Sequence, residues 1–254
     1  MSNEVQDTGM VLKIAHLYPT LMSVAADRGN LYAIQKRCQW RGIATEVEQI
    51  YVRQTPDFTK YDLLLIHGAA DREMELASRD IQLKGPALIE AAQANVVFLS
   101  ICAGFQLLGH YYKPSQGPEL KGVGLLDFCT EGGSTRFMTH MAMACDLEGV
   151  GKKILVGYEN HSGRTWLGDN VQPLGKVIVG WGNNGKDGFE VEVLVLIQQQ
   201  GPYASLGARD AFDHGEHHPA HGGVLAQGIK GGIGPAQDDY LPDHAPLAHT
   251  KGAG

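Results

Sequence analysis

Two largely apolar runs, Tyr61–Ile66 and Val96–Ile101, constrain the fold of this chain more than any other feature. Runs of this kind are typical of strands that are buried on both faces, as in parallel sheets, whereas strands with one wet face alternate polar and apolar residues. Each run ends in small residues, at Gly68–Ala70 and at Ala103–Gly104. The sequence therefore predicts a parallel sheet whose strands end in tight turns.

Helical and strand patterns alternate around these runs. A strand is predicted at Val11–Tyr18, followed by a helix at Asp27–Gln39 with apolar residues at Leu31, Ile34 and Cys38. The other predicted elements are a strand at Ile43–Ile50, a helix at Asp71–Ile89 interrupted near Gly85–Pro86, and a helix at Gly104–Tyr112. This alternation predicts an α/β fold: a doubly wound, mostly parallel sheet with helices on both faces.

Shorter strands follow Pro114 and predict a mixed extension of the sheet. These strands are expected at Gly122–Phe128, Lys153–Tyr158, Val177–Trp181 and Val191–Ile197. We therefore predict one domain over residues 10–197. Residues 198–254 form an atypical Gly/His-rich tail without apolar periodicity, for which no fold is predicted. His214, His217, His218 and His221 lie in this tail, but their spacing fits no specific zinc motif, so no metal site is predicted.

The formal charge of -7 and the isoelectric point near 5.8 argue against nucleic acid or an anionic membrane surface as a partner. No apolar run approaches the roughly 18 residues that a membrane-spanning helix needs, so we expect no membrane insertion and a cytoplasmic location. The four cysteines are widely spread and contain no C-x-x-C pair, which indicates free thiols.

Cys102 stands apart because it lies where a buried strand is predicted to turn sharply into a helix. The partial positive charge of a helix amino terminus favours thiolate over thiol, and the thiolate is the nucleophile. The N–H of Ala103 would reach a developing oxyanion, and the Gly68–Ala69 turn after the neighbouring strand would supply a second donor. Two ordinary tight turns remain the alternative interpretation of these residues.

Ordered strings along the chain carry a family resemblance. They are Asp27–Leu31, Asp71–Glu73, Ile101–Gly109, Leu125–Phe128, Gly157–Thr165 and Gly180–Asn184. Over about Ile14–Glu190 the chain resembles the glutaminase subunits, called GatD, of lipid II isoglutaminyl synthases, which are similar to the glutaminase part of cobyric acid synthases. The most specific strings are E-N-H-x-G-R-T and G-x-G-N-N.

The resemblance implies a class I glutamine amidotransferase fold and hydrolysis of L-glutamine to glutamate and ammonia. The ammonia would pass to a partner of the Mur ligase type, called MurT, in a heterodimer. That partner would use ATP to amidate the D-glutamate of lipid II to isoglutamine. The chain itself has no Walker A string, so ATP chemistry is expected in the partner and no cofactor is expected here.

Residue by residue, the resemblance assigns Cys102 as the nucleophile and Arg136 as a glutamine-recognition residue. An arginine suits this role because its planar fork can hold a carboxylate in two parallel hydrogen bonds, although a surface ion pair is the alternative. Asp27 matches an acidic family position, but we interpret it as a helix cap. We interpret His161 and Arg164 as structural or interface residues.

The expected general base is missing. In the family a histidine occupies a Gly-Thr-Tyr-Leu-His-Gly string, and the corresponding segment here is Gly201–Gly207, which has none. Either a downstream residue such as His214 has taken the role, or glutaminase activity is lost, or the reading frame after about Glu190 is not that of the family. The alternative functions are thus a non-catalytic scaffold that docks the ligase and another cysteine hydrolase of this class.

Overall fold

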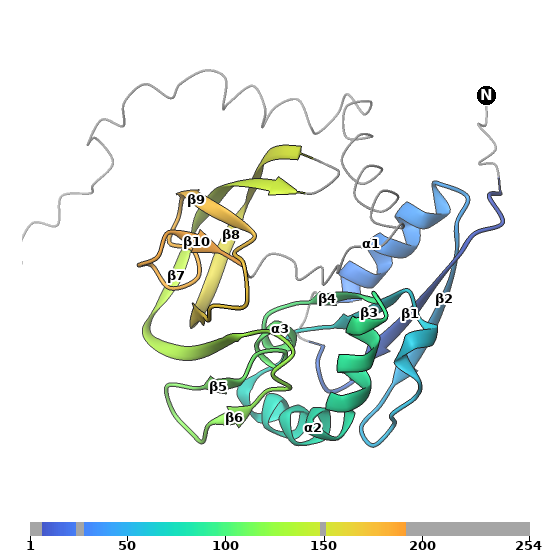
Figure 1. The fold of residues 1–254 in the computed structure, drawn as a ribbon, viewed down its shortest axis with the longest axis horizontal. Helices are drawn as coiled ribbons and strands as arrows, with labels where there is room; N and C mark the ends of the chain where they lie inside the picture. The colour runs from blue at the N-terminus through green and yellow to red at the C-terminus, as the bar shows by residue number, and fades with distance from the viewer. Residues whose placement is uncertain (1–6, 24–27, 148–150, 192–254) are drawn as a thin grey trace, which may run out of the picture. The chain divides into compact units, whose positions relative to one another are not determined.

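The computed structural model describes residues 7–23, 28–147 and 151–191 (Figure 1). All of them belong to one compact unit, residues 1–205. Asp27, His214 and the predicted tail at 198–254 lie outside the described residues, so the predicted domain boundary stays a prediction. No helix within the described ranges has both the length and the apolar character to cross a bilayer.

Four parallel strands form the first sheet, in the order β2-β1-β3-β4. The elements of this part are β1 (Val11–Leu17), α1 (Arg28–Gln39), β2 (Ala44–Ile50), the 3-10 helix η1 (Phe58–Lys60), β3 (Leu63–Ile66), α2 (Asp71–Gln93) and β4 (Val97–Ser100). The order runs outward from β1 in both directions, which confirms the predicted doubly wound α/β fold.

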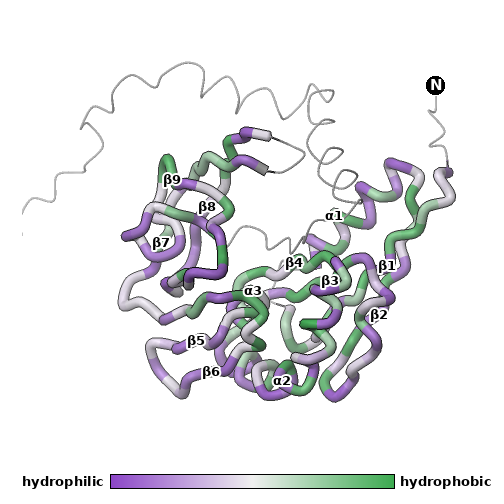
Figure 2. Tube along the Cα trace, viewed as in Figure 1, coloured by the Kyte–Doolittle hydropathy of each residue, from purple (hydrophilic) through white to green (hydrophobic). Residues whose placement is uncertain are grey.

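Successive residues of the strands enter two separate apolar clusters, one on each face of the sheet. Ala15 and Leu64 pack in the cluster that contains Ile81 of α2. Ile14 and Leu65 pack in the cluster that contains Ile34 of α1. Because strand side chains alternate between faces, α1 and α2 cover opposite faces of the sheet. Figure 2 shows the apolar character of β3, whose four residues are all buried.

Helix α2 runs without a break through Pro86, so the predicted interruption at this point is wrong. A proline inside a helix removes one hydrogen bond and costs about 3 kcal/mol. Ile81 before the proline and Leu88 and Ala91 after it are all fully buried in one cluster. Burying such side chains contributes about 1.5–3 kcal/mol for a large apolar residue, which offsets the cost.

Helix α3 covers only Ala103–Gln106, shorter than the predicted Gly104–Tyr112 helix, and of the predicted Gly122–Phe128 strand all but Phe128 is a loop. The two corrections share one cause. The backbone N–H groups of Val123 and Leu126 donate to the carbonyls of Leu107 and Leu108, at 2.8 and 3.1 Å. The loop therefore uses the carbonyl acceptors that a longer helix would need, and its own N–H donors are no longer available to a strand ladder.

The remaining strands form a second, six-stranded mixed sheet, not the predicted extension of the first. Its strands are β5 (Tyr111–Lys113), β6 (Leu120–Lys121), β7 (Phe128–Leu147), β8 (Gly151–Leu167), β9 (Gly175–Val179) and β10 (Phe189–Glu190). The long β7 pairs with β5, β8 and β9 and so organises this sheet (Figure 1). Val191 follows β10 outside any strand, and the rest of the predicted Val191–Ile197 strand lies outside the described residues.

Candidate active site

Cys102 lies at the turn between β4 and α3 with its backbone at φ 53° and ψ −115°. Positive φ is uncommon for residues other than glycine, and a residue held in such a region costs about 1–3 kcal/mol. Cys102 is also exposed. A strained, exposed cysteine directly before a helix is the geometry expected of a nucleophile raised above the end of a sheet.

The turn at Ile101–Gly104, here called the elbow, lies close to the end of β3, and Gly104 makes this close approach possible. A Cβ at this position would lie 2.5 Å from the carbonyl oxygen of Ile66 and 2.9 Å from that of His67. Contacts this short are not tolerated, so only glycine allows α3 to begin here. The small residue that was expected to permit a tight turn therefore also sets the spacing between the two neighbouring strand ends.

The three expected oxyanion donors lie at one edge of the parallel sheet. Ile66 and Ser100 are paired at the ends of β3 and β4, and the N–H of Ile101 donates to the carbonyl of Ile66 at 2.9 Å. The Gly68–Ala69 turn and Ala103 follow these strand ends. Ala103 is the first residue of α3, and the first N–H groups of a helix have no acceptor within the helix.

Two buried histidines, which the sequence did not single out, meet beside this turn. His16 Nε2 lies 3.0 Å from His67 Nδ1, and their rings pack edge to face. Burial lowers the pKa of His16 from 6.5 to about 4, and electrostatic repulsion from His67 and Arg28 contributes to the shift. His16 is therefore neutral at pH 7, and its hydrogen bond anchors the first residue of the turn that contains Gly68.

Arg136 lies in an irregularity of β7, where the register with β8 shifts between Gly132 and Phe137. Its Nε donates to Oδ1 of Asn160 at 2.6 Å, and its Nη2 donates to the carbonyl of the same residue at 3.0 Å. Arg136 forms no salt bridge with any described residue, so this part of the chain gives no support to the alternative of a surface ion pair. The exposed guanidinium is held in one orientation by a neutral partner.

The two most specific strings are joined to each other. The buried carboxylate of Glu159 accepts the backbone N–H groups of Trp181 and Gly182, each at 2.8 Å. The side-chain amide of Asn184 donates to the carbonyl of Thr165 at 2.9 Å. Hydrogen bonds to a carboxylate are stronger than those between neutral groups. The segments Gly157–Thr165 and Gly180–Asn184 therefore form one unit.

Gly163 brings this unit against the helix that follows Cys102. A Cβ on Gly163 would lie 3.0 Å from Nε2 of Gln106 and 2.9 Å from Cγ2 of Thr130. Gln106 in turn donates its backbone N–H to the carbonyl of Cys102 at 3.0 Å. Nδ1 of His161 lies 2.9 Å from the carbonyl of Gly163 and donates to it, because a carbonyl only accepts.

The described histidines have structural contacts of their own. His16 bonds to His67, His161 bonds to the Gly163 carbonyl, and His110 Nε2 lies 3.0 Å from Oδ1 of Asp127. This contact, together with hydrogen bonds from Asn170, lowers the pKa of Asp127. The position at which the family has its histidine, Gly201–Gly207, lies outside the described residues.

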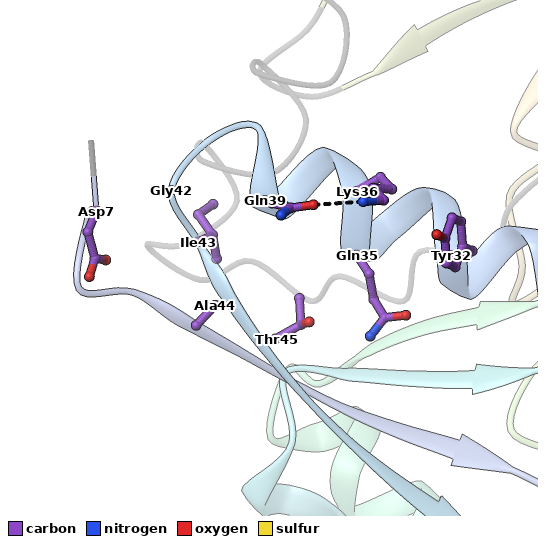
Figure 3. Close-up of a pocket in the computed structure, with 9 residues that line it drawn as sticks. All are labelled: Asp7, Tyr32, Gln35, Lys36, Gln39, Gly42, Ile43, Ala44 and Thr45. Atoms are coloured by element: carbon purple, nitrogen blue, oxygen red, sulfur yellow. Dashed lines mark hydrogen bonds between the residues drawn. The ribbon is translucent and has the colours of Figure 1, made fainter. Parts of the chain in front are cut away.

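A cavity of about 580 Å³ lies between α1 and β2 (Figure 3). Tyr32, Gln35 and Lys36 line it from the helix, and Thr45 lines it from the strand. None of the predicted site residues contributes to its lining. Within the described part of the chain, no three His, Cys, Asp or Glu side chains gather as a metal site requires.

Comparison with known proteins agrees with the resemblance inferred from the strings. Residues 13–195 match the CobB/CobQ-like glutamine amidotransferase domain. The chain is 35% identical over 176 residues to the lipid II isoglutaminyl synthase (glutamine-hydrolyzing) subunit GatD of Staphylococcus aureus strain N315, covering 69% of this chain and 70% of that protein. The corresponding subunit of Streptococcus pneumoniae strain R6 is 33% identical, with 68% and 66% covered.

A cobyric acid synthase of Listeria monocytogenes strain HCC23 is 29% identical over 146 residues, which cover 53% of this chain but only 27% of that enzyme. The similarity is thus confined to one part of the synthase. The elbow at Cys102 and the joined strings lie within the matched segment of the chain. This chain belongs to the CobB/CobQ-like glutamine amidotransferase family.

Proposed function

We propose that this chain is the glutaminase subunit of a lipid II isoglutaminyl synthase, which hydrolyses L-glutamine to glutamate and ammonia. The observation that carries the proposal is the strained, exposed Cys102 at the elbow, within a chain that is 35% identical to a subunit of that name. Cys102 is the nucleophile in this proposal, and no cofactor or metal takes part.

In the proposed reaction the thiolate of Cys102 attacks the side-chain carbonyl carbon of glutamine. The N–H groups of Ala103 and of the Gly68–Ala69 turn stabilise the resulting oxyanion. The carbon–nitrogen bond then breaks, the nitrogen takes up the proton that the Cys102 thiol lost, and ammonia leaves a glutamyl thioester behind. Water cleaves the thioester to give glutamate and the free thiol.

Arg136 is the proposed recognition residue for the substrate carboxylate. Asn160 accepts hydrogen bonds from Nε and Nη2 of Arg136. Nη1 forms no hydrogen bond with the part of the chain that the structure describes. A guanidinium that is fixed in this way loses less conformational entropy when it binds an anion. Its charge and orientation suit a free amino acid such as L-glutamine.

The proposed destination of the ammonia is a MurT-type Mur ligase subunit that forms a heterodimer with this chain in the cytoplasm. The similar proteins of two bacteria are named as subunits of a lipid II isoglutaminyl synthase, which supports such a partner. The partner would activate the D-glutamate of lipid II with ATP and amidate it to isoglutamine during peptidoglycan synthesis.

Ammonia release from L-glutamine tests the proposal, measured for the full chain alone and with the ligase partner. We expect Cys102→Ala to abolish release and Cys38→Ala, which removes a half-buried thiol of α1, to retain it. Release by Cys102→Ala would contradict the assignment. No release by the unaltered chain under either condition, with amidation supported by external ammonium, would instead establish a scaffold that docks the ligase.

A further inference from the structure

The register shift in β7 creates a bulge directly before Phe137. Gly132 pairs with Gly163 and Phe137 pairs with His161, so residues 133–136 of β7 stand opposite a single residue of β8. Arg136 is the last residue of this bulge. Extra residues in a strand leave the ladder and need other contacts to fix them. The position of Arg136 therefore depends on whatever holds the bulge against β8.

Arg164 of β8 holds the bulge from the opposite strand. Its Nη2 donates to both the carbonyl and the Oγ1 of Thr135, at 2.8 and 3.2 Å. Its Nη1 donates to the carbonyls of Ser162 and Gly163, at 3.0 and 3.1 Å. One guanidinium thus joins the backbone of both strands at the point where their ladder is interrupted. Gly133 completes the fit, because a Cβ there would lie 3.0 Å from Cζ of Arg164.

An aromatic ring reinforces this arrangement. The Cζ of Arg164 lies 3.4 Å from the ring centroid of Phe137, in a cation–π contact. The Phe137 ring also stacks on Trp181, with centroids 5.1 Å apart and an interplanar angle of 17°. Glu159 fixes the backbone of Trp181. The residues on both sides of Arg136 are therefore attached to Arg164, Thr135 by hydrogen bonds and Phe137 by its ring.

We propose that Arg164 is a positioning residue for glutamine recognition, which acts by fixing the bulge that presents Arg136. The inference rests on the proposed function, in which Arg136 binds the carboxylate of glutamine. Lysine cannot replace Arg164, because a single ammonium group lacks the planar fork that reaches acceptors on two strands and lies flat on a ring. Arg164 itself need not touch the substrate.

Amide hydrogen exchange of the full chain tests the bulge without any substrate. Arg164→Lys is expected to make the amides of residues 134–137 exchange at least about tenfold faster, because opening of a local segment sets their rate. Arg79→Lys is the matched control, since Arg79 is an exposed residue of α2 that contacts Glu75. Unchanged exchange in Arg164→Lys would overturn the inference and leave the proposed function intact.

Glutamine affinity tests the consequence, measured by calorimetry with variants in a Cys102→Ala background that prevents turnover. We expect Arg136→Ala and Arg164→Ala each to raise Kd for L-glutamine at least about tenfold, as the loss of a charge-assisted hydrogen bond implies. The double variant is expected to bind no more weakly than Arg136→Ala alone.

The other outcomes separate the two proposals. Additive losses in the double variant would show that Arg164 does not act through Arg136, and would overturn the inference alone. Unchanged affinity in Arg136→Ala would instead remove the recognition role that the proposed function gives this residue. No binding by the Cys102→Ala parent would overturn both. Thermal unfolding of each variant identifies any loss of binding that follows from loss of the fold.

Discussion

Gly163 of β8 and Gln106 of α3 touch so closely that a Cβ on the glycine would lie 3.0 Å from the Gln106 side-chain nitrogen. At this contact the mixed sheet meets the helix that directly follows Cys102. Because Gln106 also donates its backbone N–H to the Cys102 carbonyl, one residue links Gly163 to the turn at Cys102.

Gly163→Ala is therefore expected to lower the free energy of unfolding by about 1–3 kcal/mol, the usual cost of overpacking a close contact. Urea denaturation measures the change. Gly157→Ala is the matched control, because Gly157 lies in the same strand and an added Cβ there would have no heavy atom within 4 Å. Its free energy of unfolding should change by less than about 0.5 kcal/mol. Equal effects in the two variants would contradict the close contact.

Gly104→Ala is expected to distort the elbow, since the added methyl group would lie 2.5 Å from a backbone oxygen that cannot move freely. The alkylation rate of Cys102 by iodoacetamide should change, and the unfolding free energy should fall by about 1–3 kcal/mol. Gly29→Ala in α1 has open space and should raise stability by up to about 1 kcal/mol through helix propensity. An unaltered alkylation rate in Gly104→Ala would refute this role for the glycine.

Glu159→Gln is expected to destabilise the chain by about 1–3 kcal/mol, because an amide replaces a buried carboxylate that accepts two backbone N–H groups. Thermal and urea unfolding measure the loss. Glu131→Gln changes an exposed glutamate of β7 in the same way and should have little effect. If both substitutions cost the same, the contact between the two family strings does not stabilise the sheet.

The buried His16 predicts a pH dependence of stability. Its pKa is about 4 in the folded chain and 6.5 in the reference state, so the unfolded chain binds the proton more readily. The contribution of His16 is complete above pH 6.5 and is lost as the pH falls toward 4. We expect the urea midpoint to fall over this range by less in His16→Gln than in the parent. Parallel pH profiles for the two proteins would contradict the depressed pKa.

Local patterns predict the parallel sheet because β3 and β4 are largely apolar runs, β1 is mostly apolar, and β2 alternates polar and apolar residues, as an edge strand does. The predicted break at Pro86 is wrong because the burial of Ile81 and Leu88 in one cluster, a tertiary effect, outweighs the lost hydrogen bond. The apolar residues of Gly122–Phe128 have the pattern of a strand, although their backbone groups bond to the end of α3. Periodicity does not distinguish these cases.

Part of the candidate site can also be predicted from local sequence, and part of it cannot. Cys102 and its small neighbours are visible in the sequence because the turn requires those residue types locally. The contact between His16 and His67 is not, since it depends on β1 and β3 being neighbours although 51 positions separate the two residues. The available signal is that His16 lies near the end of the apolar strand β1 and His67 directly follows the apolar strand β3. Arg164 can be placed in a family string, but only the paired strands give it a partner in Thr135.

The attachment of Glu159 to Trp181 has a consequence for protein engineering. Glu159, before β9 in the sequence, accepts a hydrogen bond from the backbone of Trp181, which lies after β9 and 22 positions further along the chain. A graft that moves only the β7–β8 hairpin into another scaffold would leave out Trp181, whose ring stacks on Phe137 next to the bulge at residues 133–136. A graft that keeps this bulge supported must therefore include the Gly180–Asn184 turn.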